Sequence, residues 1–176
     1  MRTGTRDGGG AAARSGRVVV GVGGSPASLG ALRLAVAHAR RSGRDLVAVL
    51  AWEPPEGEGL YLRRPDPQWA RFWYEEARGA LARAVEQALG GVPADLRVEL
   101  RVVRARADRA LLDLAGRPDD LIVVGARPRR FRRGRVERAL RRSAGCPVLT
   151  VPLRGALRGD LRALRRASPA DFGLSG

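Results

Sequence analysis

Hydrophobic positions in this chain follow two patterns, short continuous apolar runs and longer stretches in which apolar residues recur every three or four positions. Runs rich in Val, Leu and Ile are typical of strands buried on both faces. The third run alternates, as a strand with one exposed face does. We therefore predict five strands, within RVVVGV at 17–22, DLVAVLAW at 45–52, LRVELRVV at 96–103, DDLIVVGA at 119–126 and PVLTVPL at 147–153.

Helical periodicity fills the segments between the predicted strands. Ser25 is positioned to cap a first helix, Pro26 suits its first turn, and Gly43 ends it. Strands that alternate with crossover helices form a parallel sheet covered on both faces, so the expected fold class is a doubly wound α/β domain. The other predicted helices cover residues 68–89, 107–116 and 134–145.

Three segments lack either pattern or lie outside the predicted sheet. Residues 1–15 have no periodicity and are expected to be a disordered basic segment, while residues 16–153 are expected to form the folded domain. The Pro- and Gly-rich stretch 53–67 is predicted to be a long loop, either a lid or a disordered insertion. Residues 154–176 form an Arg-rich tail that could be helical through about position 166. This tail either packs on the domain or frays; the alternative is binding to a partner or a membrane surface.

Charge is the most unusual feature of the composition. All 33 basic residues are arginines, against 18 acidic residues, which gives a formal net charge of +15. This excess indicates either a polyanionic partner or the coding bias of a GC-rich genome. No apolar run is long enough to span a bilayer, and the N-terminal sequence lacks an apolar signal segment, so we expect a cytoplasmic protein with no membrane partner. A single Cys and a single His do not suffice for an ordinary zinc site.

Two predicted strands end in glycines, at GVGGS (21–25) and at GARPRRFRRG (125–134). Ligands of open parallel sheets bind beyond the carboxyl ends of the strands, where glycines allow close approach of the backbone. Ser25 and the helix that follows it would offer hydroxyl and amide donors to an anion. The spacing of these glycines fits neither the dinucleotide fingerprint nor the P-loop.

These segments resemble a known family. RVVVGVGGSPASLGALRLAVAHA is similar to the N-terminal half of a universal stress protein domain, and DLIVVGA together with GRVERALRRSAGCPVLTVP is similar to its C-terminal half. The resemblance covers roughly residues 17–152. It implies a five-stranded parallel Rossmann-like fold, a homodimer paired through the last strand and, in one branch of the family, ATP bound between the first and fourth strand ends.

The ATP-binding branch carries a G-x-x-G, nine residues, then G-[ST], and this chain departs from that motif. Gly125 and Gly134 match the first and last glycines, but Pro128 replaces the second glycine and Arg135 replaces the Ser or Thr. The intervening loop is four residues short, and Gly23 stands where the family commonly has an aspartate. The resemblance nevertheless implies a candidate nucleotide site made of Gly21, Gly23, Ser25, Ala51, Val124, Gly125, Arg127, Gly134, Arg135 and Val136.

The arginines of the divergent loop leave three interpretations open. The loop is solvated and holds no small ligand, or its guanidinium groups grip the phosphates of an altered nucleotide, or it contacts nucleic acid or polyphosphate. The candidate polyanion contacts are Arg127, Arg129, Arg130, Arg132 and Arg133.

Other chemically capable residues have mainly structural interpretations. His38 lies in the first helix without a paired nucleophile, and Cys146 is expected to pack at the start of the fifth strand. Trp69, Phe72 and Trp73 are expected to close the core near the strand ends, with a lid that stacks on a base as the alternative. No residues form a credible catalytic set, so we do not expect an enzyme, although slow ATP hydrolysis stays open.

Three hypotheses about function follow from these features. The first is a non-catalytic stress-response domain that acts as a dimer, with ATP binding weakened or lost and no firm cofactor. The second is an adenine-nucleotide switch that binds ATP through the arginine-rich loop. The third is a basic accessory protein that binds nucleic acid or polyphosphate. The dimer would form through an apolar edge strand containing Val148, Leu149, Val151 and Leu153.

Overall fold

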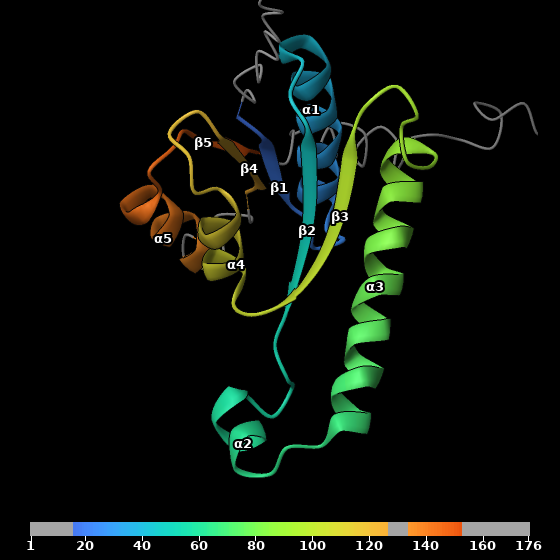
Figure 1. Cartoon of the computed structure of the whole chain (residues 1–176), viewed down its shortest axis with the longest axis vertical. Helices are drawn as coiled ribbons and strands as arrows, with labels where there is room; N and C mark the ends of the chain where they lie inside the picture. Colours follow the sequence, from blue (N-terminus) through green and yellow to red (C-terminus); the bar gives the residue numbers. More distant parts are fainter. Residues whose placement is uncertain (1–15, 127–133, 153–176) are drawn as a thin grey trace, which may run out of the picture.

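The computed structural model describes residues 16–126 and 134–152. Its centre is a five-stranded sheet in the order β3-β2-β1-β4-β5, and every strand pair is parallel (Figure 1). This arrangement confirms the predicted doubly wound α/β fold. The strands are β1 (Val18–Gly21), β2 (Leu46–Trp52), β3 (Val98–Arg104), β4 (Leu121–Gly125) and β5 (Val148–Val151).

Helices cover both faces of the sheet. On one face α1 and α3 enclose a core that includes Val18, Leu32 and Val123, all fully buried. On the other face α4 and α5 enclose a second core around Val19, Ile122 and Leu140. The alternation of these core positions along β1 and β4 explains why the central strands are continuously apolar. The helices are α1 (Pro26–Ser42), α2 (Glu58–Arg63), α3 (Pro67–Leu89), α4 (Ala107–Leu114) and α5 (Arg135–Ser143).

The segment that follows β2 was wrongly predicted to be one long loop. It contains α2, and the reason is a tertiary contact rather than local propensity. Tyr61 of α2 is buried, its hydroxyl donates to the carbonyl of Asp66 at 3.2 Å, and the Arg104 guanidinium lies 3.8 Å from its ring centroid. Asp66 in turn caps α3 by accepting from the N–H groups of Gln68 and Trp69.

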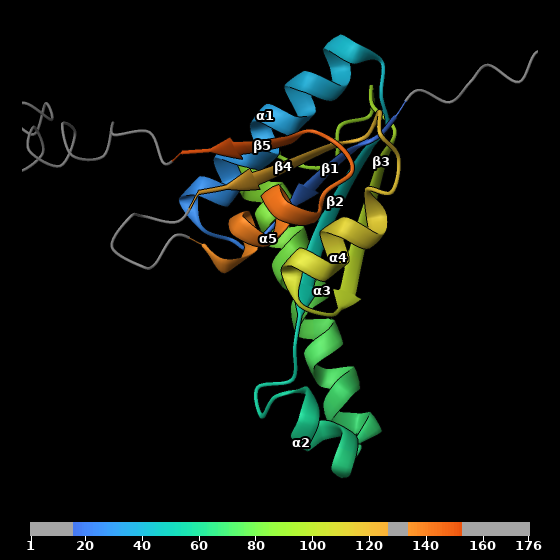
Figure 2. The same ribbon diagram turned by 90° about the vertical axis from the view of Figure 1, so that its left-hand side faces the viewer.

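α2 and the first part of α3 project beyond the sheet, as both ribbon views show (Figures 1 and 2). Only the later part of α3 packs on the core, through Leu81, Ala84 and Val85. The predicted closure of the core by the aromatic residues of α3 is therefore wrong. Trp69 is 43% exposed and Phe72 51% exposed, because the sheet ends before it reaches them.

Among the described residues, no helix is both long enough and apolar enough to cross a bilayer. The predicted structures of the terminal segments, residues 1–15 and 154–176, lie outside the described residues.

Candidate functional site

A pocket of about 760 Å³ opens at the carboxyl edge of the sheet. Its wall is formed by the ends of β1, β2 and β4, and the starts of α1, α4 and α5 complete it. Parallel strands end at the same edge, so the crevice where β1 and β4 diverge is the position at which open α/β sheets bind ligands. The apolar part of the lining consists mainly of Val22, Val49, Ala51, Leu111 and Val124.

The turn between β1 and α1 is held by its own serines. Ser25 has extended backbone angles, and its hydroxyl accepts from the N–H of Ser28 at 3.2 Å, which confirms its predicted role as the helix cap. The buried Ser28 hydroxyl accepts from the N–H of Gly23 at 2.7 Å. The same hydroxyl lies 3.5 Å from the Gly21 carbonyl, to which it donates. The Gly23 amide, a candidate donor to a ligand, is therefore already engaged within the protein.

Gly125 lets the end of β4 pass directly against the first turn of α1. A Cβ at this position would lie 2.5 Å from the carbonyl carbon of Ala27 and 2.6 Å from the nitrogen of Ser28, closer than real Cβ contacts. Only glycine therefore fits here. The close approach brings the N-terminus of α1 to the pocket beside the end of β4, where its positive dipole faces the cavity.

The start of α5 presents charges of both signs to the pocket. Gly134, Arg135 and Glu137 all line it. The Glu137 carboxylate pairs with Arg141 at 3.0 Å on the next turn of the helix and accepts from the hydroxyl of Thr150 at 3.4 Å. Two neighbours thus fix this carboxylate in the first turn of α5, the helix whose N-terminal amides an incoming phosphate would meet.

The sequence-predicted site residues are largely brought together. Nine of the ten line this pocket, and the tenth, Arg127, lies outside the described residues, as do the polyanion candidates Arg129, Arg130, Arg132 and Arg133. Sequence reasoning missed Ser28 and Glu137. Ser28 stands three residues after the cap, a spacing at which a side chain can reach back to the preceding turn.

Titratable groups in the described part of the chain do not gather into a metal site. No cluster of three or more His, Cys, Asp or Glu residues within residues 16–126 and 134–152 is arranged to hold an ion. Glu137 is the acidic residue of the pocket lining, and neither His38 nor Cys146 is part of that lining.

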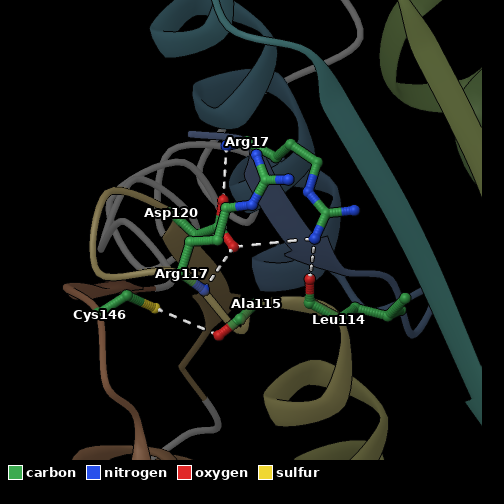
Figure 3. Close-up of polar contacts among 6 residues, drawn as sticks. All are labelled: Arg17, Leu114, Ala115, Arg117, Asp120 and Cys146. Carbon is green, nitrogen blue, oxygen red and sulfur yellow. Dashed lines mark hydrogen bonds and ion pairs between the residues drawn. The ribbon is translucent and has the colours of Figure 1, made fainter. Parts of the chain in front are cut away.

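A polar cluster lies at the opposite edge of the sheet, where β4 begins (Figure 3). Asp120 is 1% exposed, and its carboxylate accepts from the N–H of Arg17 at 2.7 Å and from the N–H of Arg117 at 3.1 Å. The Arg17 guanidinium lies 3.8 Å from the same carboxylate and donates to the carbonyl of Leu114. Asp120 therefore links the residue that precedes β1 to the start of β4.

Cys146 lies beside this cluster and has the packing role that was expected of it. Its thiol lies 3.9 Å from the Ala115 carbonyl and packs against the core beneath α4 and α5. Burial raises the pKa of the Cys146 thiol, and the nearby Asp120 carboxylate raises it further. The thiol is therefore held in its less reactive protonated form.

Comparison with known proteins gives a consistent result. Residues 15–152 match the model of the universal stress protein family. Universal stress protein UspA from Lactobacillus plantarum is 23% identical, with a TM-score of 0.58, and the match covers 79% of this chain and 99% of that one. A comparison with curated proteins found no significant match.

Two structures from Archaeoglobus fulgidus share the fold. One universal stress protein from this organism is 21% identical, covers 77% of this chain and 93% of its own, and has a TM-score of 0.54. The universal stress protein in complex with dAMP is 22% identical, covers 78% and 98%, and has a TM-score of 0.52. The fold and the pocket at its carboxyl edge define a Rossmann-like α/β domain. With the family match over most of its length, this chain belongs to the universal stress protein family.

Proposed function

We propose that this chain is a non-catalytic, dimeric stress-response domain whose pocket accepts the base and sugar of an adenine nucleotide but holds the triphosphate weakly. The main support for the proposal is that the pocket has an intact apolar wall, whereas polar groups at its mouth are already bonded to other groups of the protein. The Gly23 amide donates to Ser28, and the Glu137 carboxylate is paired with Arg141 and accepts from Thr150.

The size and lining of the pocket suit a nucleoside. A volume of about 760 Å³ falls within the range of small-molecule sites, roughly 300–1,000 Å³. Flat, weakly polar bases bind well between aliphatic side chains, and here Val22, Val49 and Leu111 supply these surfaces. The dAMP complex of the Archaeoglobus fulgidus protein supports an adenine nucleotide as the ligand class.

The phosphates of the ligand would contribute less binding free energy than the base and sugar. The N-termini of α1 and α5 and the Arg135 side chain favour an anion at the pocket, whereas the Glu137 carboxylate opposes it. Gly23 has no free amide to offer without breaking its 2.7 Å bond to Ser28. We therefore expect the second and third phosphates of ATP to add little affinity over AMP.

Calorimetric titration with adenosine, AMP, Mg-ATP and tripolyphosphate tests this function. Adenosine and AMP are expected to bind, ATP to bind no more tightly than AMP, and tripolyphosphate to bind weakly, with a strong dependence on salt. The variant Ala51→Phe fills the apolar part of the pocket and should abolish adenosine binding. The matched variant Ala94→Phe places the same side chain on an exposed loop and should bind as the wild type does.

Two results of the titration would contradict the proposal. Binding of ATP far tighter than that of AMP would indicate a switch that uses its phosphate loop. Equal binding of ATP and tripolyphosphate that collapses in high salt would make the protein a polyanion binder.

Dimer formation through β5 is the second part of the proposal. β5 and β3 are the two edge strands, and they differ in chemistry. β3 carries exposed charges, and its Glu99 and Arg101 form an ion pair at 2.6 Å, which discourages pairing with another sheet. β5 reads Val-Leu-Thr-Val and has no charge, and Leu149 is 38% exposed. The remaining predicted contact, Leu153, lies outside the described residues.

Light scattering of two matched variants tests the dimer. Leu149→Arg places a charge on the β5 edge and is expected to yield monomers. Leu100→Arg makes the same change on β3, where the leucine is 40% exposed, and should leave the dimer intact. A wild type that is monomeric at micromolar concentration overturns this part of the proposal without affecting nucleotide binding.

A further inference from the structure

The projecting part of the molecule exposes an aromatic surface that the proposed pocket and dimer edge leave unused. We call this part the arm, residues 53–76. Trp69, Phe72 and Trp73 form one cluster, with ring centroids 5.3 to 5.8 Å apart. Besides Trp69 and Phe72, the arm exposes Leu60, Leu62 and Tyr74 by 43 to 66%. Exposed apolar groups that gather in this way mark interaction surfaces.

The arm is acidic within a strongly basic protein. It contains six carboxylates and three arginines, a formal net charge of −3 in a chain whose net charge is +15. Among the described residues, Glu53 and Glu76 form no ion pair. A surface of exposed aromatic rings and carboxylates is complementary to arginine, whose guanidinium stacks on rings and pairs with carboxylates.

One arginine is already held by the arm in this way. The Arg104 guanidinium, from the end of β3, lies 3.8 Å from the ring centroid of Tyr61 and donates to the Glu58 carboxylate at 2.9 Å. Trp52, its partner in the adjacent strand, lies beneath the same guanidinium at 5.9 Å. The arm therefore already binds one arginine of the folded domain through an aromatic ring and a carboxylate.

We propose that the arm is the docking surface for the C-terminal segment of the same chain, residues 153–176. This segment carries five arginines and two aspartates, a net charge of +3, and has Leu157, Leu161 and Leu164 at helical spacing. It thus offers arginines to the carboxylates and rings of the arm and leucines to its apolar surface. Residues 1–15 also carry arginines but contain no large aliphatic or aromatic residue after Met1.

The topology brings the two partners within reach. β5 ends at Val151 and the arm follows the end of β2, and because all strands are parallel both ends lie at the carboxyl edge of the sheet. Three strand spacings separate β5 from β2, about 15 Å. The 24 residues of the segment span up to about 80 Å when extended, so contact within one chain is unhindered. Covalent attachment raises the effective concentration of the segment and favours this over contact between molecules.

Tryptophan fluorescence of the full chain tests the proposal, because all three tryptophans lie in the arm or at the end of β2 that leads into it. The variant Leu157→Ser, Leu161→Ser, Leu164→Ser removes the apolar side of the segment without touching the described cores. We expect its emission to shift to longer wavelength and its quenching by acrylamide to rise about twofold, because rings covered in the wild type become accessible. The matched control changes Ala11, Ala12 and Ala13 to Ser and should behave as the wild type does.

A substitution on the arm and the triple-serine substitution in the C-terminal segment should have non-additive effects on quenching. Leu62→Ala, at an arm leucine that is 66% exposed and outside the aromatic cluster, is expected to increase quenching in the wild-type background and to add nothing in the triple-serine variant, whereas effects of unrelated residues would add. Val92→Ala, at a similarly exposed position beyond α3, serves as the control. Equal quenching of the wild type and the triple-serine variant overturns the proposal. Protection that appears only at high protein concentration, or only when nucleotide is added, also overturns it, in favour of a second copy or a bound base.

Discussion

Gly125 at the end of β4 lies in direct contact with Ala27 in the first turn of α1, so that a Cβ on the glycine would stand 2.5 Å from the Ala27 carbonyl carbon. The neighbouring atoms belong to the backbone of a capped helix and have little freedom to move. This contact fixes the N-terminus of α1 against the strand that forms the pocket wall. The shape of the site therefore depends on a residue that has no side chain.

Replacement of this glycine should destabilise the fold. Gly125→Ala is expected to lower the free energy of unfolding by about 2 kcal/mol or more, because β4 and α1 must separate to admit the methyl group. Urea denaturation measures the change. Gly30→Ala, in the middle of α1 with open space around it, is the matched control and should raise stability by about 0.5–1 kcal/mol. A neutral Gly125→Ala variant would contradict the close approach.

The Ser28 hydroxyl stabilises the turn between β1 and α1 beside the pocket. Ser28→Ala removes the acceptor of the Gly23 N–H and should cost about 1–2 kcal/mol of stability. Amide hydrogen exchange provides the specific readout, since the Gly23 amide should lose its protection while amides of β3 keep theirs. Unchanged protection at Gly23 would mean that another acceptor holds this turn.

Asp120 is a buried polar side chain at the opposite edge of the sheet, where it bonds backbone N–H groups as Ser28 does at the carboxyl edge. Asp120→Asn keeps the size of the side chain but removes the charge that faces Arg17 and places an amide donor near two backbone N–H groups. We expect a loss of about 2–3 kcal/mol in the free energy of unfolding. Asp119→Asn, on an exposed neighbour, should change stability little. Equal effects of the two variants would contradict the internal role of Asp120.

The elements that the sequence predicted correctly are those with a strong local signal. β1 and β4 are continuous apolar runs because both faces are covered, and α1 carries its cap, Ser25, and its first-turn proline in the sequence itself. The candidate site residues came together for a topological reason, since parallel strands end at one edge and bring residues distant in sequence into one pocket.

The features that were missed depend on contacts between distant parts of the chain. α2 contains a glycine and is short, and Tyr61 is fixed there by Arg104 from β3, a contact that no local pattern reveals. The exposure of Phe72 follows from the length of the sheet beside α3, and the burial of Asp120 follows from its position beneath the start of β1. Each depends on the finished packing rather than on periodicity.

Cys146 should be a slow thiol in the native protein. Because the thiolate is the reactive form, the raised pKa of Cys146 predicts slower reaction with an aromatic disulfide reagent than in the urea-unfolded chain, with the rate increasing as pH rises. Asp120→Asn removes one cause of the raised pKa and should accelerate the reaction, whereas Asp119→Asn should not. Rapid labelling of the folded wild type at neutral pH would be inconsistent with this protonation state.

Glu137 should discriminate between the parts of a nucleotide. Glu137 is a pocket-lining residue in the first turn of α5, so its carboxylate should repel a phosphate bound there, whereas a nucleoside carries no charge for it to oppose. Glu137→Gln is therefore expected to strengthen ATP binding about three- to tenfold, as the removal of one partly screened like charge at close range does, and to leave adenosine binding unchanged. Glu99→Gln makes the same change in net charge on β3, away from the pocket, and separates local repulsion from the field of the whole protein. Calorimetric titration measures all four combinations. Equal gains for both variants would assign the effect to net charge, and a gain for adenosine as large as that for ATP would place the carboxylate beside the base instead of the phosphates.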